Sequence, residues 1–476
     1  MSEAWLGRIG AATSISSAAK YSQGERLNAT HFNSFANLRR VTSSPIGHIL
    51  TNAQVWSADG KWIYFDVRSD RHGGVFDGRE IRRVHVQTEE ENVVYRAVGQ
   101  ACCGVVLAHP LEEKIVFIHG PEYPNSAWSY GAARRGGVVL VIGQSIPERL
   151  DARDMVEPFT PGAHRGGSHV HQFSPTGDWI SFTYEDEYLE ALLRGGCKAE
   201  KNQRNIGIAI PNVPVTVLPR HPRNQSATYY TLVCTETWDA PQPGSDQVQR
   251  AYEESWVGAH GYQKVDGTRQ NRALVFLGDL ILLDGRKATE LFVADIPENV
   301  AADDQAYRST VAMKKQRLKP TPAIRQRRLT HLLEGFEPGL QGVRFWPRST
   351  PDGAFVFVLK KDRHGVTQFW RVKTSDGQSQ QWTHNPSDVS TSFTISADGR
   401  WIAHGMDGSV CVTSCEDGRT IRVTESFGDD IEILPEAMVW NPAGNSIAFV
   451  SPQRVVGSVY NQIFVVDVDR ATLDRL

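Results

Sequence analysis

The chain has 476 residues, with 51 Lys and Arg against 54 Asp and Glu, and its formal net charge is −3. Apolar residues make up 40% and aromatic residues 9% of the chain, as in an ordinary globular protein. A near-neutral balance without a run of like charge excludes a protein built around nucleic acid, which would need a concentrated basic face. The longest uncharged apolar stretches, such as 136–143, fall far short of the roughly 20 residues that cross a bilayer, so no membrane partner is predicted.

Residues 1–31 are predicted to form an N-terminal extension. Residues 1–20 scatter Ser, Gly and charges where a secretory signal would place a continuous apolar core. The six cysteines have no C-x-x-C spacing, so they indicate neither a disulfide framework nor a zinc ribbon, and we interpret them as mostly buried thiols. These features together predict a cytoplasmic protein.

A strand–turn–strand unit recurs along the chain. Its turn has the form Ser/Thr/Asn-Pro/Ala-x-Gly and is followed by an aromatic or aliphatic run; the turns lie at 57–60, 174–177, 350–353, 396–399 and 441–444. Proline presets φ at the second turn position, and glycine takes the positive φ that closes a tight hairpin. The turn chemistry therefore predicts five hairpins with equivalent glycines.

The spacing of the turn glycines indicates how many units the chain holds. Gly353, Gly399 and Gly444 are 46 and 45 residues apart, and the longer gaps before them leave room for two degenerate units, which we assign to 105–118 and 258–277. A period in the forties with paired short strands is typical of propeller blades. The sequence therefore predicts an all-β fold, a seven-bladed β-propeller.

Later strands and interruptions complete the domain organisation. Amphipathic runs predict third strands at 80–86, 138–142, 368–373, 409–413 and 462–468. The last blade shows only three strands, so the N-terminal segment 32–42 is expected to add its outer strand and hide a pairing edge. We predict a single domain over 32–476 with two insertions. The first, 184–257, contains two predicted helices, at 185–193 and 246–254. The second, 297–328, is predicted to be an exposed linker.

Polar residues gather where inner strands begin and second strands end, which lie on the same face of a propeller, at the mouth of its channel. His169 and His171 are two residues apart on one inner strand and would share a face; with His260 from the next blade they could hold a divalent metal ion. The alternative is that these histidines are hydrogen-bonding elements of the mouth. Neither a G-x-S-x-G elbow nor a P-loop is present, so hydrolase and nucleotide-binding cores of those types are not indicated.

The repeated units SADGKWIYF, SPTGDWISF, TPDGAFVFV and SADGRWIAH resemble TolB-type, WD40-like propeller repeats over nearly the whole chain. The chain also resembles, more distantly, the oligogalacturonate lyases, a family of seven-bladed rings that hold a manganese-type ion with histidines and a glutamine and cleave uronate oligomers by β-elimination. This resemblance implies that His171 in HVHQF, and Gln381 and His384 in QWTH, are metal ligands. The chain departs from that family where Pro386 stands in place of a second histidine.

We therefore expect either a metal-assisted lyase or a binding scaffold. In the lyase, His169, His171, His260, Gln381 and His384 would hold the divalent ion, because removal of a proton α to a carboxylate needs a cation and a base. The base or charge clamp would come from Arg68, His119 or Lys360, and the substrate, an acidic oligosaccharide, would contact Arg71, Tyr123, Tyr184 and Glu185. In the alternative, a non-catalytic TolB-like propeller binds a protein or glycan at the channel mouth.

Overall fold

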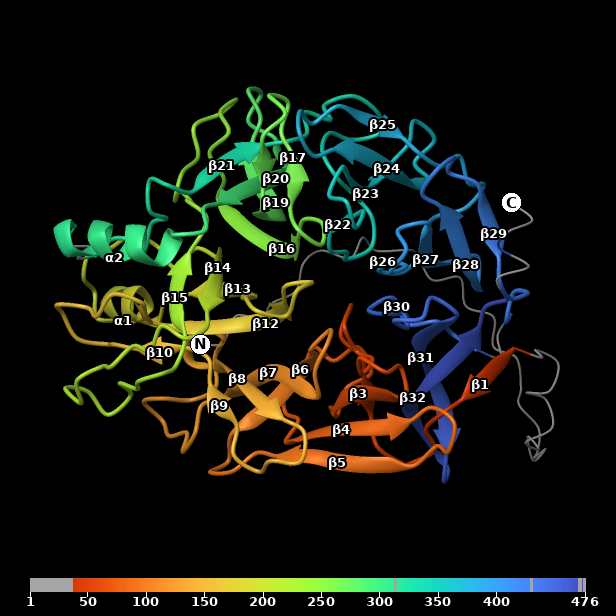
Figure 1. The fold of residues 1–476 in the computed structure, drawn as a ribbon, viewed down its shortest axis with the longest axis horizontal. Helices are drawn as coiled ribbons and strands as arrows, with labels where there is room; N and C mark the ends of the chain where they lie inside the picture. The colour runs from red at the N-terminus through yellow and green to blue at the C-terminus, as the bar shows by residue number, and fades with distance from the viewer. Residues whose placement is uncertain (1–36, 312–314, 429–430, 470–472, 474–476) are drawn as a thin grey trace, which may run out of the picture. The chain divides into compact units, whose positions relative to one another are not determined.

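The computed structural model describes residues 37–311, 315–428, 431–469 and 473. These residues form seven four-stranded antiparallel sheets, which follow one another around a centre (Figure 1). Only two short α-helices accompany them, α1 (Glu187–Arg194) and α2 (Val300–Thr310), within the part of the chain that the structure describes. The predicted seven-bladed β-propeller is confirmed.

Each blade has its inner strand at the centre and its outer strand at the rim. Blades 1 to 3 consist of β2 (His48–Ile49), β3 (Trp62–Val67), β4 (Glu80–His85) and β5 (Glu91–Arg96); β6 (Cys102–Ala108), β7 (Lys114–Gly120), β8 (Gly136–Val141) and β9 (Glu148–Arg149); and β12 (Gly167–Phe173), β13 (Ile180–Glu185), β14 (Asn205–Ile210) and β15 (Tyr230–Val233). Blades 4 and 5 consist of β16 (Arg250–Trp256), β19 (Arg272–Ile281), β20 (Lys287–Ile296) and β21 (Arg325–Arg328); and β22 (Arg348–Ser349), β23 (Phe355–Lys361), β24 (Thr367–Lys373) and β25 (Ser379–Gln381). Blades 6 and 7 consist of β26 (Thr394–Ile395), β27 (Trp401–Met406), β28 (Ser409–Ser414) and β29 (Thr420–Arg422); and β30 (Met438–Trp440), β31 (Ser446–Val455), β32 (Ser458–Asp467) and β1 (Leu38–Arg40).

The two ends of the chain close the ring in blade 7. Strand β1 pairs antiparallel with β32, and Leu38 lies opposite Val466. The pairing continues at Val41, whose N–H donates to the carbonyl of Ile463 at 2.9 Å. This is the predicted closure; residues 32–36 of the segment predicted for it lie outside the described residues.

The hairpin turns have the conformation that the repeats predict. The five turn glycines have φ between +67° and +79°. The first turn residue also orders the next strand, since Ser57 and Ser396 each accept the N–H of the residue five positions on, at 3.0 Å. The turn motif is therefore a local hydrogen-bonded unit that each blade repeats.

The fourth blade departs from the sequence prediction. Its inner strand is β16, which covers most of the helix predicted at 246–254, and the turn at 265–267 closes a separate hairpin between β17 (Tyr262–Gln263) and β18 (Arg269–Gln270). The reason is a β-bulge: Glu253 has φ +54°, and the pairing with β19 shifts between Tyr252 and Ser255. The bulge breaks the period-two alternation by which a strand is recognised.

The two predicted insertions also contain strands that belong to the blades. Segment 184–257 contains β14, β15 and β16, and its extra elements are connecting loops and α1, close to the helix predicted at 185–193. Segment 297–328 contains α2 and β21 rather than only an exposed linker. It is attached to blade 3, because the Tyr230 hydroxyl donates to Asp304 of α2 at 3.0 Å.

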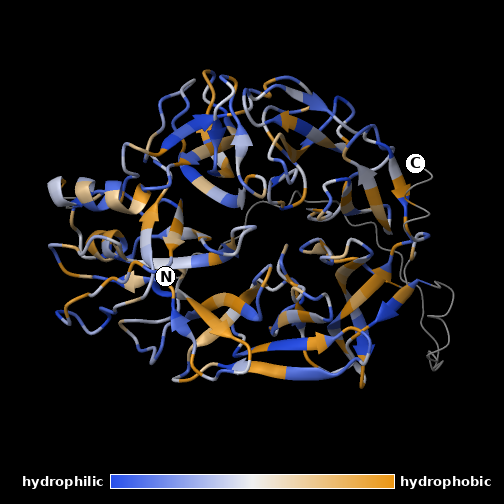
Figure 2. Cartoon of the chain, viewed as in Figure 1, coloured by the Kyte–Doolittle hydropathy of each residue, from blue (hydrophilic) through white to orange (hydrophobic). Residues whose placement is uncertain are grey.

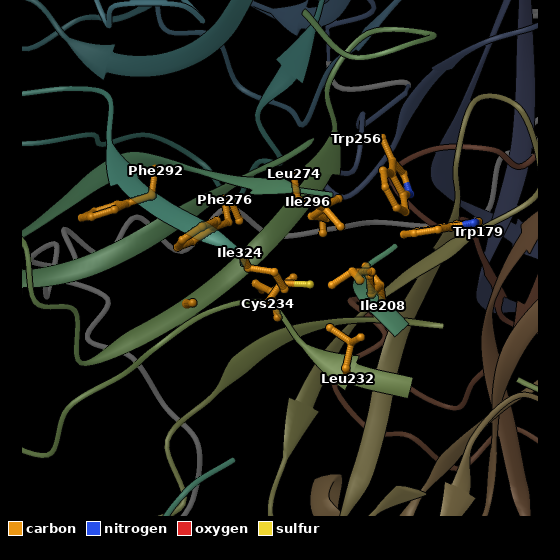
Figure 3. Packing of buried hydrophobic residues seen from close by; sticks show 14 of the residues in the cluster. Trp179, Ile208, Leu232, Cys234, Trp256, Leu274, Phe276, Phe292, Ile296 and Ile324 are labelled. Atoms are coloured by element: carbon orange, nitrogen blue, oxygen red, sulfur yellow. The ribbon is translucent and has the colours of Figure 1, made fainter. Parts of the chain in front are cut away.

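The core lies between neighbouring blades. Figure 3 shows this for blades 3 and 4, where Ile208 and Leu232 face Leu274 and Phe276. Apolar residues are concentrated on the strands throughout the ring (Figure 2), because each sheet buries both of its faces. All six cysteines are free thiols, and none of the described helices has the length and apolar character of a bilayer span.

Candidate functional site

Three of the predicted site residues lie at the end of the ring where the inner strands begin, and their side chains contact other groups of the protein. The guanidinium of Arg68 donates to the buried Asp66 carboxylate at 2.7 Å, and Arg71 forms an ion pair with Glu432. Lys360 is buried, and its ammonium donates to the carbonyls of Glu337 and Gly339 at 2.9 and 3.0 Å. Arg68 and Lys360 contact different groups, and no hydrogen bond among the described residues joins them.

Two more predicted residues, Glu185 and Tyr184, lie on β13 beside the inner strand of blade 3. Glu185 accepts two hydrogen bonds from Arg204, at 3.1 and 3.0 Å, and lies 3.4 Å from Nε2 of His169. Burial lowers the pKa of His169 to about 3, so this imidazole is neutral at physiological pH. Tyr184 is 1% exposed and cannot contact a ligand from solution.

His171 belongs to a separate buried network between blades 2 and 3. The Ser168 hydroxyl donates to Asp151 at 3.1 Å and lies 2.9 Å from Nε2 of His171. Asp151 also accepts the N–H of Gly137 on β8 at 2.9 Å. Because all of these groups are buried, the network joins two blades and is closed to substrate.

The predicted metal ligands do not converge. A bulge at Val170, with φ +57°, separates His169 from His171, so they do not share one strand face. His260 is exposed and follows the end of β16, at the opposite end of the ring from the start of β12. Gln381 and His384 lie at the outer strand of blade 5, where Gln381 Nε2 is 3.0 Å from His384 Nδ1. Across the described ranges no three His, Cys, Asp or Glu side chains are grouped to hold a metal, and the predicted set does not fit a divalent ion.

Two of the predicted residues, His119 and Tyr123, do meet in one concave site. It has a volume of about 480 Å³ and lies between β5 of blade 1, the end of β7 and β8 in blade 2, and residues 222–225 of the loop that follows β14. We call it the arginine pocket, after three residues that the sequence analysis missed: Arg149, Arg153 and Arg223. Its aromatic lining residues are Tyr95, Tyr123 and Trp128.

The charge in the arginine pocket is positive and rigidly held. Arg153 is buried and donates to the carbonyls of Gly166 and Arg135, at 3.0 and 3.3 Å. Arg223 donates to the carbonyls of Glu122 and Tyr123, at 2.8 and 3.2 Å, and its guanidinium lies 5.2 Å from the ring centre of Trp128. Carbonyl oxygens orient a guanidinium without neutralising it.

Two carboxylates act on these three cations: Glu122 in the lining of the pocket, and the buried Asp151, whose charge acts on Arg153. Arg149 lies 3.1 Å from Glu122, and its other nitrogen donates to Gln225 at 2.6 Å. Burial opposes the ionisation of Glu122, but the hydrogen bond from His119 and the charge of Arg149 prevail and lower its pKa to about 2. The pocket therefore keeps an excess of positive charge.

A hydrogen-bond chain forms one wall of the arginine pocket. Nδ1 of His119 lies 3.2 Å from Glu122, and Nε2 lies 3.0 Å from the hydroxyl of Tyr95. Because ionised Glu122 can only accept, Nδ1 carries the proton and Nε2 accepts from Tyr95. Burial raises the pKa of Tyr95 to about 12, so its hydroxyl stays protonated and donates.

The blades and their closure define a seven-bladed β-propeller, a fold similar to that of an oligogalacturonate lyase. The structure of an oligogalacturonate lyase in complex with manganese superposes with a TM-score of 0.52 at 10% identity, over 92% of this chain and 94% of that chain. TolB from Acinetobacter baumannii is 12% identical over 87% of this chain and 81% of its own, with a TM-score of 0.34. At 10% identity the likeness to the lyase is one of fold.

The sequence comparison identifies the family. The uncharacterized protein YidR of Escherichia coli K12 is 36% identical over 435 residues, which cover 91% of this chain and 97% of YidR. The chain belongs to the YidR family. Residues 102–225 also match a family model described as "Protein of unknown function (DUF3748)". That range includes His119 and all three arginines of the arginine pocket.

Proposed function

We propose that this protein binds an acidic oligosaccharide in the arginine pocket. The observation that carries the proposal is the arrangement of three fixed guanidiniums, Arg149, Arg153 and Arg223, in a pocket whose lining holds one carboxylate, Glu122. Carboxylates of uronic acids accept paired hydrogen bonds from arginine, and the exposed ring of Tyr123 offers a face on which a sugar ring can stack. A concave site of about 480 Å³ suits a small ligand better than a flat protein surface.

The test is calorimetric titration with a galacturonate trisaccharide, with neutral maltotriose as the matched ligand. We expect binding of the acidic sugar alone, and a Kd at least about tenfold weaker in Arg223→Gln, since a charge-assisted contact is lost. Arg286→Gln is the control, because Arg286 is an exposed arginine in blade 4 that pairs with Asp284. Equal binding of the two sugars, or equal loss in both variants, would refute the proposal.

A second function, β-elimination on the bound uronate, is supported by the chain Tyr95–His119–Glu122 beside the arginines. In this scheme an arginine neutralises the uronate carboxylate. It takes the role predicted for a metal ion, whose predicted ligands do not fit. The Tyr95 oxygen takes the α-proton while its own proton passes to Nε2 of His119, and Glu122 stabilises the imidazolium. The C–H electron pair forms the new double bond, and the bond to the glycosidic oxygen breaks. That oxygen takes a proton from water, and the hydroxide so formed takes back the proton from the imidazolium of His119.

This reaction is tested by the ultraviolet absorbance of an unsaturated uronate during incubation with the trisaccharide. We expect product formation by the wild type and a loss of about 100-fold or more in Tyr95→Phe and His119→Gln, with trisaccharide binding retained. Arg286→Gln again serves as the control. Binding without any unsaturated product from the wild type would leave the protein as a binding propeller and reject the lyase.

A further inference from the structure

A second cavity opens at the other end of the ring, where the inner strands end and the hairpin turns begin. It has a volume of about 480 Å³, and every one of the seven blades contributes to its lining. We call it the turn-end vestibule. Its collar is formed by the second residue of each turn, which is alanine in three blades (Ala58, Ala259 and Ala397) and proline in the other four. The repeated turn thus builds a continuous apolar rim.

Aromatic side chains form the wall of the turn-end vestibule below this rim. Trp56, Trp256 and Trp440 come from blades 1, 4 and 7 and are largely buried. The indole N–H of Trp56 donates to the carbonyl of Val439, and that of Trp256 to the carbonyl of Gln172, both at 3.1 Å. These contacts set the ring positions, so the wall is preformed and apolar.

One cation lies at the floor. Arg348 begins β22 in blade 5 and is 8% exposed. Its guanidinium reaches across the channel to three other blades: it donates to the Ser255 hydroxyl at 3.0 Å, to the side chain and carbonyl of Asn52, and to the carbonyl of Phe393 at 3.5 Å. Every one of these partners is neutral.

Arg348 makes no ion pair among the described residues, and Glu253 and Glu254 act on its charge only from a longer distance. Burial lowers its pKa to about 10, so the guanidinium remains protonated at physiological pH. Its hydrogen bonds in the described part of the chain all go to neutral acceptors, and its Nη1 donates to the Ser255 hydroxyl alone. A buried charge without a partner is costly, and an anion supplied by a ligand would offset that cost.

We propose that the turn-end vestibule binds a small organic anion whose carboxylate pairs with Arg348 and whose apolar body packs between the tryptophans and the collar. A cavity of this size with apolar walls and a single convergent charge has the form of a small-molecule site. The ligand differs in kind from the sugar proposed for the arginine pocket. That pocket offers several charges on a polar surface, whereas the vestibule offers one charge inside an apolar enclosure.

The test uses 3-phenylpropanoate and its neutral amide, 3-phenylpropanamide, followed by tryptophan fluorescence and calorimetry, with inorganic phosphate as a third probe. We expect the acid to change the tryptophan emission and to bind at least tenfold more tightly than the amide or phosphate. Arg348→Met should weaken the binding of the acid at least tenfold and leave the binding of the amide unchanged. Equal binding of acid and amide, or of acid and phosphate, would overturn the proposal.

A second pair of variants tests the proposal even if Arg348→Met does not fold. Ala397→Phe narrows the collar at an exposed position, and Ala443→Phe adds the same ring to a turn residue that lies outside the vestibule. Ala397→Phe should weaken the binding of 3-phenylpropanoate at least tenfold, and Ala443→Phe should leave its affinity unchanged. Equal affinity of the two variants for 3-phenylpropanoate would overturn the proposal. Titration of each variant with the galacturonate trisaccharide separates this proposal from the function of the arginine pocket, because neither substitution lies near that pocket.

Discussion

At the scale of single residues, Glu254 is an acid buried without an ion-pair partner among the described residues. Glu254 lies on β16 and is 1% exposed, and the Thr183 hydroxyl donates to one of its oxygens at 3.1 Å. The other oxygen has no hydrogen-bond partner in the described part of the chain. Burial raises the pKa of Glu254 from 4.5 to about 8, so the carboxyl is protonated at neutral pH.

This residue predicts a pH dependence of stability. In the unfolded chain Glu254 loses its proton near pH 4.5, whereas the folded protein retains it up to about pH 8, so the free energy of unfolding falls as pH rises between these values. Glu254→Gln should remove this slope. At pH 8.5 the variant should be more stable than the wild type by about 4 kcal/mol, while near pH 4.5 the two should be similar.

The measurement is urea unfolding of both proteins across this pH range. Exposed Glu416→Gln is the control and should follow the wild type at every pH. A constant difference between Glu254→Gln and the wild type from pH 4.5 to 8.5 would contradict the protonated state assigned to Glu254.

At the scale of elements, the inner strands of blades 2, 3 and 4 share an irregularity. Val105, Val170 and Glu253 have φ between +54° and +57°, and the strand pairing shifts at each of them. A bulge resets which side chains face which blade. For this reason His169 faces Glu185 while His171 faces Ser168, although their spacing predicts a common face.

The turns yield a prediction about packing between blades. Gly399 has φ +75°, and a Cβ there would lie 2.5 Å from Cδ of Pro351 in the preceding blade; Gly444 has φ +67°, with no atom within 4 Å of the equivalent position. Both Gly→Ala variants should lose about 1–2 kcal/mol to the left-handed backbone. Gly399→Ala should lose about 1–3 kcal/mol more to the contact with Pro351, and Gly399→Val still more.

Thermal and urea unfolding of the two alanine variants measure this difference directly. Equal destabilisation at both positions would show that the blades do not pack through their turns, and an unchanged stability of Gly399→Val would reject the assignment of this glycine to the turn.

At the scale of the whole molecule, stability depends on the closure of blade 7. Strand β1 covers the edge of β32 and brings Leu38 and Val41, both buried, into the sheet. A chain that begins at Ser43 should therefore unfold at a lower temperature than one that begins at Asn37. We expect its free energy of unfolding to fall by about 3–6 kcal/mol, because the burial of these two side chains is lost. Its exposed edge should also promote association.

Calorimetry and size-exclusion chromatography of the two truncated chains test this closure. The chain that begins at Asn37 keeps all of the described pairing and is the matched control. Identical unfolding temperatures, together with identical elution, would mean that β1 contributes nothing to the ring.

Much of the architecture could be predicted from the sequence because its signals are local. The Ser-Ala-Asp-Gly type of turn, the apolar run after it and the period in the forties each lie within one blade, and together they determine seven blades and their closure. The same signals failed in blade 4, where the bulge at Glu253 disrupted the alternation and the Asp266-Gly267 turn belonged to an extra hairpin.

The sites, by contrast, were decided by the tertiary structure. The sequence alone identified His119 and Tyr123, but the arginine pocket also needs Tyr95 from the neighbouring blade and Arg223 from about 100 residues further along the chain. Likewise, the turn-end vestibule exists only because seven separate turns meet around one channel, with Arg348 bridging four blades. Turns and strands are encoded by residues a few positions apart, whereas a binding site depends on side chains that only the packing of blades and long loops brings together.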